Sequence, residues 1–131
     1  MIRTLQGGCH CKKVRFAIEV VDTPYITECN CSMCTITGFI HLIVPSNKFT
    51  LLTDQSELSC YQFNTKVAKH YFCKTCGVKS FYIPRSNPDG YSVNAKCLDT
   101  DEWQQWPVEN FDGQNWEDNA DTLAHLSKPD I

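Results

Sequence analysis

Three cysteines stand within one short stretch, at Cys29, Cys31 and Cys34, and the chemistry of the chain is most concentrated there. Cysteine sulfur binds zinc at about 2.3 Å, and the spacing C-x-C-x-x-C allows three sulfurs to converge on one ion. No neighbouring residue offers an obvious fourth ligand. A zinc ion with only three protein ligands keeps one coordination position open, which is typical of a catalytic site.

Two further cysteine pairs suggest a second site. The pair Cys9/Cys11 follows two glycines, and the pair Cys73/Cys76 precedes another, so the backbone can turn tightly at both places. Together the pairs supply four thiolates, which make a closed, structural site. Structural zinc contributes apparent binding free energies of about 10–16 kcal/mol in small peptides, which is ample to hold two distant turns together. We therefore predict two zinc ions per chain, one structural and one catalytic.

The spacing leaves two other divisions of the ligands open. In the first, a histidine closes the three-cysteine site as its fourth ligand, and the candidates are His10, His41 and His70. In the second, Cys9 and Cys11 join two of the three cysteines 29, 31 and 34, which are called the triple below. This division leaves the pair Cys73/Cys76 short of ligands. A lone histidine in a β domain more often lies in the core or on the surface than on a metal, so we prefer the division into four and three.

Disulfide bonds do not suit this set of cysteines. Their number, nine, is odd, and Cys-x-Cys pairs are awkward to bridge internally. The N-terminus lacks the apolar segment of a secretory signal peptide, so we expect a cytoplasmic protein whose thiols stay reduced. The isolated Cys60 and Cys97 are expected to be small buried side chains within strands, with a resolving or substrate-facing thiol as the alternative.

Length and charge limit the organisation and the partners. The chain of 131 residues carries a net charge of −3, so we expect no basic face for nucleic acid. No apolar run approaches the roughly 20 residues that span a bilayer, so we expect no membrane partner. The length suits a single domain over residues 1–131, with a core at about 5–116 and a tail at 117–131.

Short strands must position these ligands. Apolar and polar side chains alternate over residues 14–20, which predicts a half-buried strand. Further strands are predicted at 39–44, 49–52, 58–63, 80–83 and 91–98, with helical turns at 101–106 and 116–126. The predicted fold is mainly β, with roughly seven to eight short strands and a small C-terminal appendage.

Three motifs, in order, resemble those of one known family. They are Gly7-Gly8-Cys9-His10-Cys11, the triple followed by Gly38, and Cys73-Lys74-Thr75-Cys76-Gly77. The arrangement resembles the glutathione-dependent formaldehyde-activating enzyme family, also called the CENP-V/GFA domain family. Residues 111–116, Phe-Asp-Gly-Gln-Asn-Trp, look like the C-terminal signature of that family, so the similarity extends over nearly the whole chain, from about Leu5 to Trp116.

The resemblance implies a β-tent fold of several short antiparallel strands. It implies a catalytic zinc on the triple and a structural zinc on the residues that match in the two pairs, Cys9, Cys11, Cys73 and Cys76. The activity of the family joins glutathione and formaldehyde to give S-hydroxymethylglutathione, formally a carbon–sulfur lyase reaction. Fold and metal sites transfer within a family better than substrate does. Asn30 stands where relatives often have histidine, and asparagine can hydrogen-bond but cannot titrate.

Several residues are candidates for binding glutathione as co-substrate. Its two carboxylates would meet Arg85, Lys79 and Lys96. His41, on the strand after the triple, is the candidate for proton transfer. The aromatic candidates for a pocket wall are Tyr82, Tyr91 and Trp116. The alternative interpretation is that these cations are solvated and that these aromatic rings belong to the core.

Other functions are compatible with the same residues. The enzyme could act on another thiol adduct or on a larger aldehyde. The domain could also be a non-catalytic zinc-binding module, although its acidic charge argues against the chromatin role known among relatives. A metal buffer or a thiol redox sensor would hold a labile zinc at the triple. The expected partners are a small-molecule thiol and an aldehyde; the oligomeric state is open, with a homodimer through a strand edge as one option.

Overall fold

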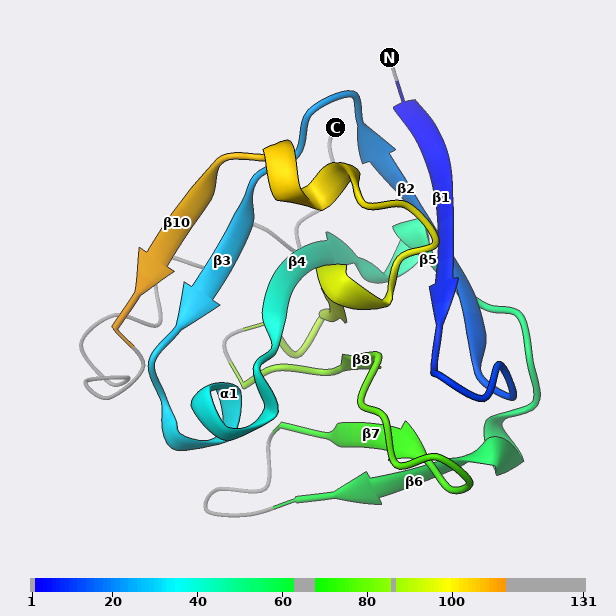
Figure 1. Ribbon diagram of the computed structural model, residues 1–131. Coiled ribbons are helices and arrows are strands. Elements are labelled where there is room, and N and C mark those ends of the chain that lie inside the picture. Colours follow the sequence, from blue (N-terminus) through cyan, green and yellow to red (C-terminus); the bar gives the residue numbers. More distant parts are fainter. Residues whose placement is uncertain (1, 63–67, 86, 113–131) are drawn as a thin grey trace.

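The computed structural model describes residues 2–62, 68–85 and 87–112, and its fold is mainly β, as predicted (Figure 1). In chain order the strands are β1 (Ile2–Gly8), β2 (Arg15–Val21), β3 (Ile26–Cys29), β4 (Ile40–Pro45), β5 (Phe49–Leu51), β6 (Leu58–Tyr61), β7 (His70–Cys73), β8 (Phe81–Tyr82), β9 (Gly90–Asn94) and β10 (Val108–Phe111). The helices are α1 (Ser32–Thr37) and four 3-10 turns, η1 (Ser46–Lys48), η2 (Gln55–Glu57), η3 (Ala95–Cys97) and η4 (Glu102–Gln105).

The strands form three small sheets. One has the order β1-β2-β5, the largest has the order β10-β3-β4-β9-β8, and β6 pairs with β7. All neighbours are antiparallel except β10 and β3, which run parallel. In Figure 1 the β1-β2 hairpin stands at one side of the molecule, β3 and β10 stand at the other, and β6 and β7 lie below.

The core fills the space between these sheets. Val14, directly before β2, and Phe16 and Ile18 on it alternate with less buried residues and are at most 1% exposed, as the alternating pattern predicts. The Phe16 ring stacks on Phe49 at a centroid distance of 5.6 Å and meets Phe81 edge-on at 6.0 Å. Aromatic contacts of this kind add to the free energy of area burial, so Phe16 joins strands of two sheets.

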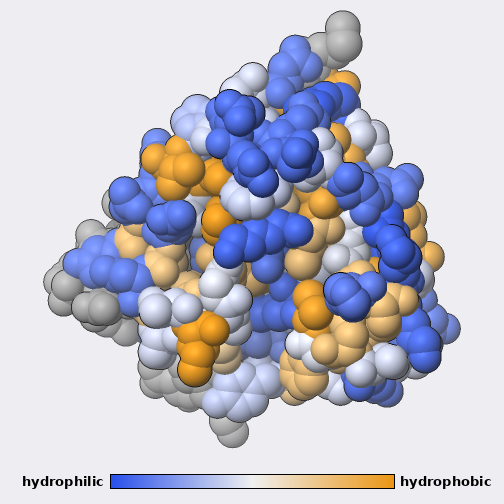
Figure 2. Space-filling model, viewed as in Figure 1, coloured by the Kyte–Doolittle hydropathy of each residue, from blue (hydrophilic) through white to orange (hydrophobic). Residues whose placement is uncertain are grey.

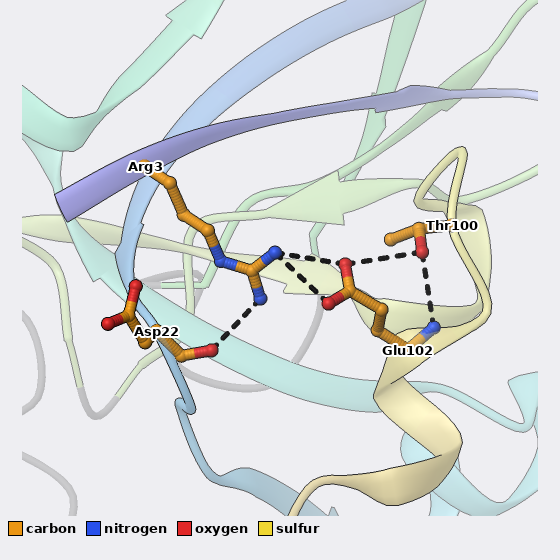
Figure 3. A network of polar contacts seen from close by, with 4 residues as sticks. All are labelled: Arg3, Asp22, Thr100 and Glu102. Carbon is orange, nitrogen blue, oxygen red and sulfur yellow. Dashed lines mark hydrogen bonds and ion pairs between the residues drawn. The ribbon is translucent and has the colours of Figure 1, made fainter. Parts of the chain in front are cut away.

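Polar contacts tie the first strand to the later part of the chain. Arg3 on β1 donates from Nη1 to both carboxylate oxygens of Glu102, each at 3.0 Å, and from Nη2 to the carbonyl of Asp22 at 3.0 Å (Figure 3). Thr100 Oγ1 donates to the same carboxylate at 3.3 Å. Arg15 on β2 forms a second ion pair with Asp99. Both pairs hold the first sheet against the segment from η3 to η4.

The predicted strand at 91–98 is too long. β9 ends at Asn94, because the Asn94 side chain accepts a hydrogen bond from the backbone N–H of Lys96 at 3.2 Å and starts the 3-10 turn η3. This capping bond gives the backbone an alternative to the sheet. Asn94 is 8% exposed, so the cap lies inside the structure rather than on its surface.

The two isolated cysteines are less buried than predicted. Cys60 is exposed on β6, which lies in a two-stranded sheet, so the expectation of a buried side chain is wrong there. Cys97 is partly buried in η3. Phe111, the first residue of the 111–116 signature, ends strand β10. Trp116, the helical turn at 116–126 and the tail at 117–131 lie outside the described residues.

The surface is mixed in character. Figure 2 shows apolar side chains as separate spots between polar ones, and one of these spots lies over α1. Ile36 on that helix is 85% exposed. Among the described residues, none of the helices has the length and apolar composition that crossing a bilayer requires.

Candidate functional site

Four cysteines from two distant turns converge in the structure. The sulfurs of Cys9, Cys11, Cys73 and Cys76 all lie within 4.8 Å of one another. Cys11 Sγ lies 3.6 Å from both Cys9 Sγ and Cys73 Sγ. Sulfurs at about 2.3 Å from one tetrahedral zinc are about 3.8 Å apart, so the spacing suits such an ion.

Backbone N–H groups point at these sulfurs. Val14 N donates to Cys9 Sγ at 3.3 Å, and Thr75 N and Cys76 N donate to Cys73 Sγ at 3.3 and 3.5 Å. Hydrogen bonds that end on sulfur stabilise the thiolate, which is the form that binds a metal. The donor set of this four-cysteine group therefore fits a bound zinc ion.

The second group contains the triple. Cys29 ends β3, Cys31 caps the N-terminus of α1, and Cys34 lies in the helix. Their sulfurs also lie within 4.8 Å of one another. Cys31 Sγ accepts from Cys34 N at 3.4 Å, so the start of the short helix sets the positions of both sulfurs. The sulfurs of this three-cysteine group could hold one metal ion, and three protein ligands would leave a tetrahedral ion one position short of four.

No histidine closes the three-cysteine group within the part of the chain that the structure describes. His10 is exposed on the turn after β1. His41 lies next to Cys34 but does not join all three sulfurs within 4.8 Å. His70 is buried against other partners, since its Nδ1 accepts from Lys79 Nζ at 2.7 Å and its ring stacks on Tyr82.

His41 is enclosed behind Cys34. Its Nε2 lies 3.1 Å from Cys34 Sγ, and its Nδ1 lies 2.9 Å from Ser92 Oγ and 3.2 Å from the Tyr82 hydroxyl. The side chain is 4% exposed, and burial lowers the pKa of His41 to about 3. The ring is therefore neutral at pH 7.

Lys79 is a cation held between aromatic rings near the three-cysteine group. Its Nζ lies 3.9 Å from the centroid of Tyr82 and 5.0 Å from that of Phe39. Burial lowers the pKa of Lys79 to about 8, although the charges of Cys34 and Cys31 act in the opposite direction. Among the described residues, no ion pair joins Lys79 to a carboxylate.

A cleft of about 420 Å³ opens beside Cys29. Asn30 borders it and donates from Nδ2 to Asp112 Oδ1 at 3.1 Å, while its backbone N–H donates to the carbonyl of Phe111 at 3.3 Å. Small-molecule pockets span about 300–1,000 Å³, so the cleft has room for a small thiol. The described residues that line it are Glu28, Cys29, Asn30, Thr35, Asn110, Phe111 and Asp112.

The candidate substrate residues are spread over several places. Lys96 is exposed near the end of α1, where a Cβ on Gly38 would lie 3.6 Å from Lys96 Nζ. Arg85 is partly buried in the segment before β9. Neither lines the cleft. Tyr91 stacks on Phe49 at 4.1 Å in the core, and Tyr82 lies behind Cys34, where its hydroxyl meets His41.

Sequence reasoning missed three groups at this site. Ser92 is 0% exposed, and it carries a hydroxyl into an otherwise apolar strand, which is the signal that could have found it. Asp112 belongs to the C-terminal signature, but the signature gives no sign that its carboxylate accepts a hydrogen bond from Asn30. Glu28, which also lines the cleft, immediately precedes the triple and gives no sequence signal of its own.

Comparison with known proteins agrees with this geometry. The glutathione-dependent formaldehyde-activating enzyme family, GFA, matches residues 4–113. A crystal structure of a Rhodobacter sphaeroides protein is 31% identical to the chain, with a TM-score of 0.70 over 79% of this chain and 99% of the other. The range matched by the family includes all seven cysteines of the two groups. The chain therefore belongs to the glutathione-dependent formaldehyde-activating enzyme family.

Proposed function

We propose that the protein is a zinc-dependent enzyme of the carbon–sulfur lyase type that joins glutathione and formaldehyde to give S-hydroxymethylglutathione. The observation that carries the proposal is the three-cysteine group. Its sulfurs converge without a fourth protein ligand among the described residues, and Cys29 also lines a cleft of about 420 Å³. A small thiol therefore has both a place to bind and a site at which its sulfur can be activated.

The proposal includes two zinc ions per chain. The four-cysteine group would hold a structural ion, and Cys29, Cys31 and Cys34 would hold a catalytic one. Bound there, zinc supplies a positive charge that favours the thiolate form of a small thiol. The proposal also includes a cytoplasmic location, where the nine unpaired cysteines would remain reduced and able to bind metal.

Lys79 is the candidate for moving the proton of the reaction. When the thiol sulfur attacks the aldehyde carbon, a C–S bond forms and the π pair of the C=O bond moves to oxygen. The Lys79 ammonium donates a proton to that oxygen, and the resulting amine regains one from the next thiol. His41, the sequence-based candidate, suits this role less because it is 4% exposed and both ring nitrogens already have partners.

The charged ends of glutathione require separate partners. Of the three cations predicted for its carboxylates, Lys79 is assigned here to proton transfer, and Arg85 and Lys96, the latter exposed near the end of α1, are the remaining candidates. Glu28 and Asp112 on the cleft would suit the ammonium group of the γ-glutamyl end. In this arrangement the carboxylates of the substrate face cationic side chains, and its ammonium group faces acidic side chains.

The test is exchange NMR on glutathione, formaldehyde and their adduct at equilibrium. The adduct forms without a catalyst, so only a rate above the blank counts. We expect the zinc-loaded protein to accelerate exchange, Cys34→Ser to abolish the acceleration, and Cys60→Ser, a change at an exposed thiol, to leave it unchanged. Absence of acceleration with two zinc ions bound per chain would overturn the proposed activity and favour another thiol substrate or a non-catalytic zinc module.

A further inference from the structure

The neighbours of His41 come from three other elements. Cys34 belongs to α1, Tyr82 to β8 and Ser92 to β9, while His41 itself lies on β4. Tyr82 and Ser92 are directly paired across β8 and β9, which brings both hydroxyls to the same ring nitrogen. Ser92 is 0% and Tyr82 7% exposed, so water does not compete for these contacts.

The contacts of the ring select one tautomer. A cysteine that binds a metal has lost its proton, so its sulfur can only accept a hydrogen bond. Nε2 of His41, which lies 3.1 Å from Cys34 Sγ, must then carry the ring proton. Nδ1 is left as the acceptor, and the Ser92 hydroxyl at 2.9 Å donates to it. In the other tautomer the lone pair of Nε2 would face a lone pair of Cys34 Sγ. In a buried place this contact is unfavourable.

The ring is also fixed in orientation. The Phe39 ring lies 4.7 Å from the His41 ring, and the Tyr82 ring lies 5.6 Å away. Packing against these two rings, together with a hydrogen bond at each nitrogen, leaves the imidazole a single arrangement. The donor on Nε2 is therefore held in place before any ligand arrives.

We infer that His41 is a positioning residue that donates its Nε2–H to Cys34 Sγ and so fixes this sulfur in the three-cysteine group. The inference rests on the proposed function only in that this group holds a metal ion. The helix that carries Cys34 has only six residues, so its own backbone bonds give the sulfur little rigidity. A hydrogen bond to the sulfur also draws charge from it, which tunes how strongly it binds the metal.

The first experiment reads the hydrogen bond directly. In the protein loaded with zinc, ¹⁵N NMR of the imidazole should show His41 as the Nε2–H tautomer. In the ¹¹³Cd-loaded protein, no scalar coupling should join His41 nitrogen to cadmium. A ring proton on Nδ1, or a measurable nitrogen–cadmium coupling, would overturn the inference, since the second result would make His41 the fourth ligand.

The second experiment measures the release of zinc to a chelator. Loss of a hydrogen-bond partner behind a metal ligand typically costs about 10–100-fold in metal affinity or activity. We expect His41→Phe to speed release from the three-cysteine group by about 10–100-fold, and His41→Gln, which keeps an N–H at a similar reach, to restore most of the retention. Release from the four-cysteine group is the internal control, and His10→Gln is the matched control.

The two experiments keep this inference separate from the proposed reaction. Equal release rates in wild type, His41→Phe and His41→Gln would overturn the positioning role even if exchange of the adduct is accelerated. Slow release and the Nε2–H tautomer in wild type would support it even if glutathione is not the substrate. If His41→Phe does not fold, the ¹⁵N and ¹¹³Cd spectra of the wild-type protein still decide.

Discussion

The sulfurs of both cysteine groups accept from backbone N–H groups, and the three-cysteine group has a side-chain contact in addition. In the four-cysteine group the donors to Cys9 and Cys73 are backbone N–H groups within the turns themselves. In the three-cysteine group Cys34 meets the side chain of His41. Backbone donors follow from the fold alone, whereas a side-chain donor can be altered without changing the turn. The second arrangement suits a site whose metal chemistry must be tuned.

The cysteine groups were the most predictable part of the site. Spacing favoured a division of seven cysteines into four and three over two alternatives, and the structure brings the same sets together. The partners of His41 could not be predicted in this way, because Ser92 reaches it through the pairing of β4 with β9, and Tyr82 through the further pairing of β9 with β8. Long-range pairing of strands has no signature in the local sequence, so these contacts required the fold.

Lys79 gives a prediction at the level of one side chain. Lys79→Met keeps the apolar stem against Phe39 and Tyr82 but removes the ammonium group. We expect the exchange rate of the adduct to fall by about 10²–10⁴-fold, the usual contribution of a general acid or base. In the wild type, the rate of adduct formation should fall as the pH rises through about 8, the pKa of Lys79, because the neutral amine cannot donate a proton.

Two comparisons make the Lys79 prediction specific. Lys74→Met removes a charge from an exposed position beside the four-cysteine group and should leave rate and pH profile unchanged. In Lys79→Met, the plot of the rate of adduct formation against pH should show no inflection near pH 8. An unchanged rate in Lys79→Met, with two zinc ions still bound, would exclude the proton-transfer role.

Secondary-structure elements were predicted unevenly. β2 was predicted because Phe16 and Ile18 alternate with less buried residues and face the core. β1 was missed because five of its seven residues are exposed or partly exposed, so no apolar pattern marks it. α1 was missed because its six residues are too few for a helical period. Its boundaries depend instead on the Cys31 cap and the turn at Gly38.

The turns that carry the cysteine pairs give a prediction at the level of elements. A Cβ on Gly8 would lie 2.1 Å from the carbonyl oxygen of Val14, a contact that requires the backbone to move. Gly77 has a φ of +77° but no atom within 4 Å of its Cβ position. We expect Gly77→Ala to lower the free energy of unfolding by about 1–2 kcal/mol through backbone strain alone, and Gly8→Ala to lower it further.

The zinc content of the two variants distinguishes backbone strain at Gly77 from the close contact at Gly8. Gly8→Ala should also weaken zinc binding by the four-cysteine group, because the displaced turn carries Cys9 and Cys11, whereas Gly77→Ala should keep both ions. Denaturant unfolding and metal analysis of the two variants test this. Equal losses of stability, with full zinc in both, would show that the close contact at Gly8 does not control the site.

At the scale of the molecule, the two groups occupy different positions relative to the sheets. Cys9 and Cys11 lie between β1 and β2, and Cys73 ends β7, so the four-cysteine group joins two separate sheets (Figure 1). The triple lies between β3 and β4, which are neighbours in one sheet. We therefore expect removal of the first group to separate parts of the fold, and removal of the second to leave its sheet paired.

Stepwise removal of zinc should show this difference. We expect a chelator to take the ion of the three-cysteine group first, without change in the far-UV circular dichroism spectrum, and the second ion only as the protein unfolds. Structural zinc contributes about 10–16 kcal/mol in small peptides, which is comparable with the whole stability of a domain, about 5–15 kcal/mol. The fold should not survive loss of the second ion.

Single substitutions should reproduce the two steps. Cys34→Ser should bind one zinc per chain and still unfold cooperatively, whereas Cys76→Ser should lose the four-cysteine ion and fold poorly or not at all. Metal analysis, circular dichroism and thermal unfolding of both variants decide between these outcomes. If Cys34→Ser lost both ions and its fold, the three-cysteine group would be part of the structural framework, and the division into a structural and a catalytic site would be wrong.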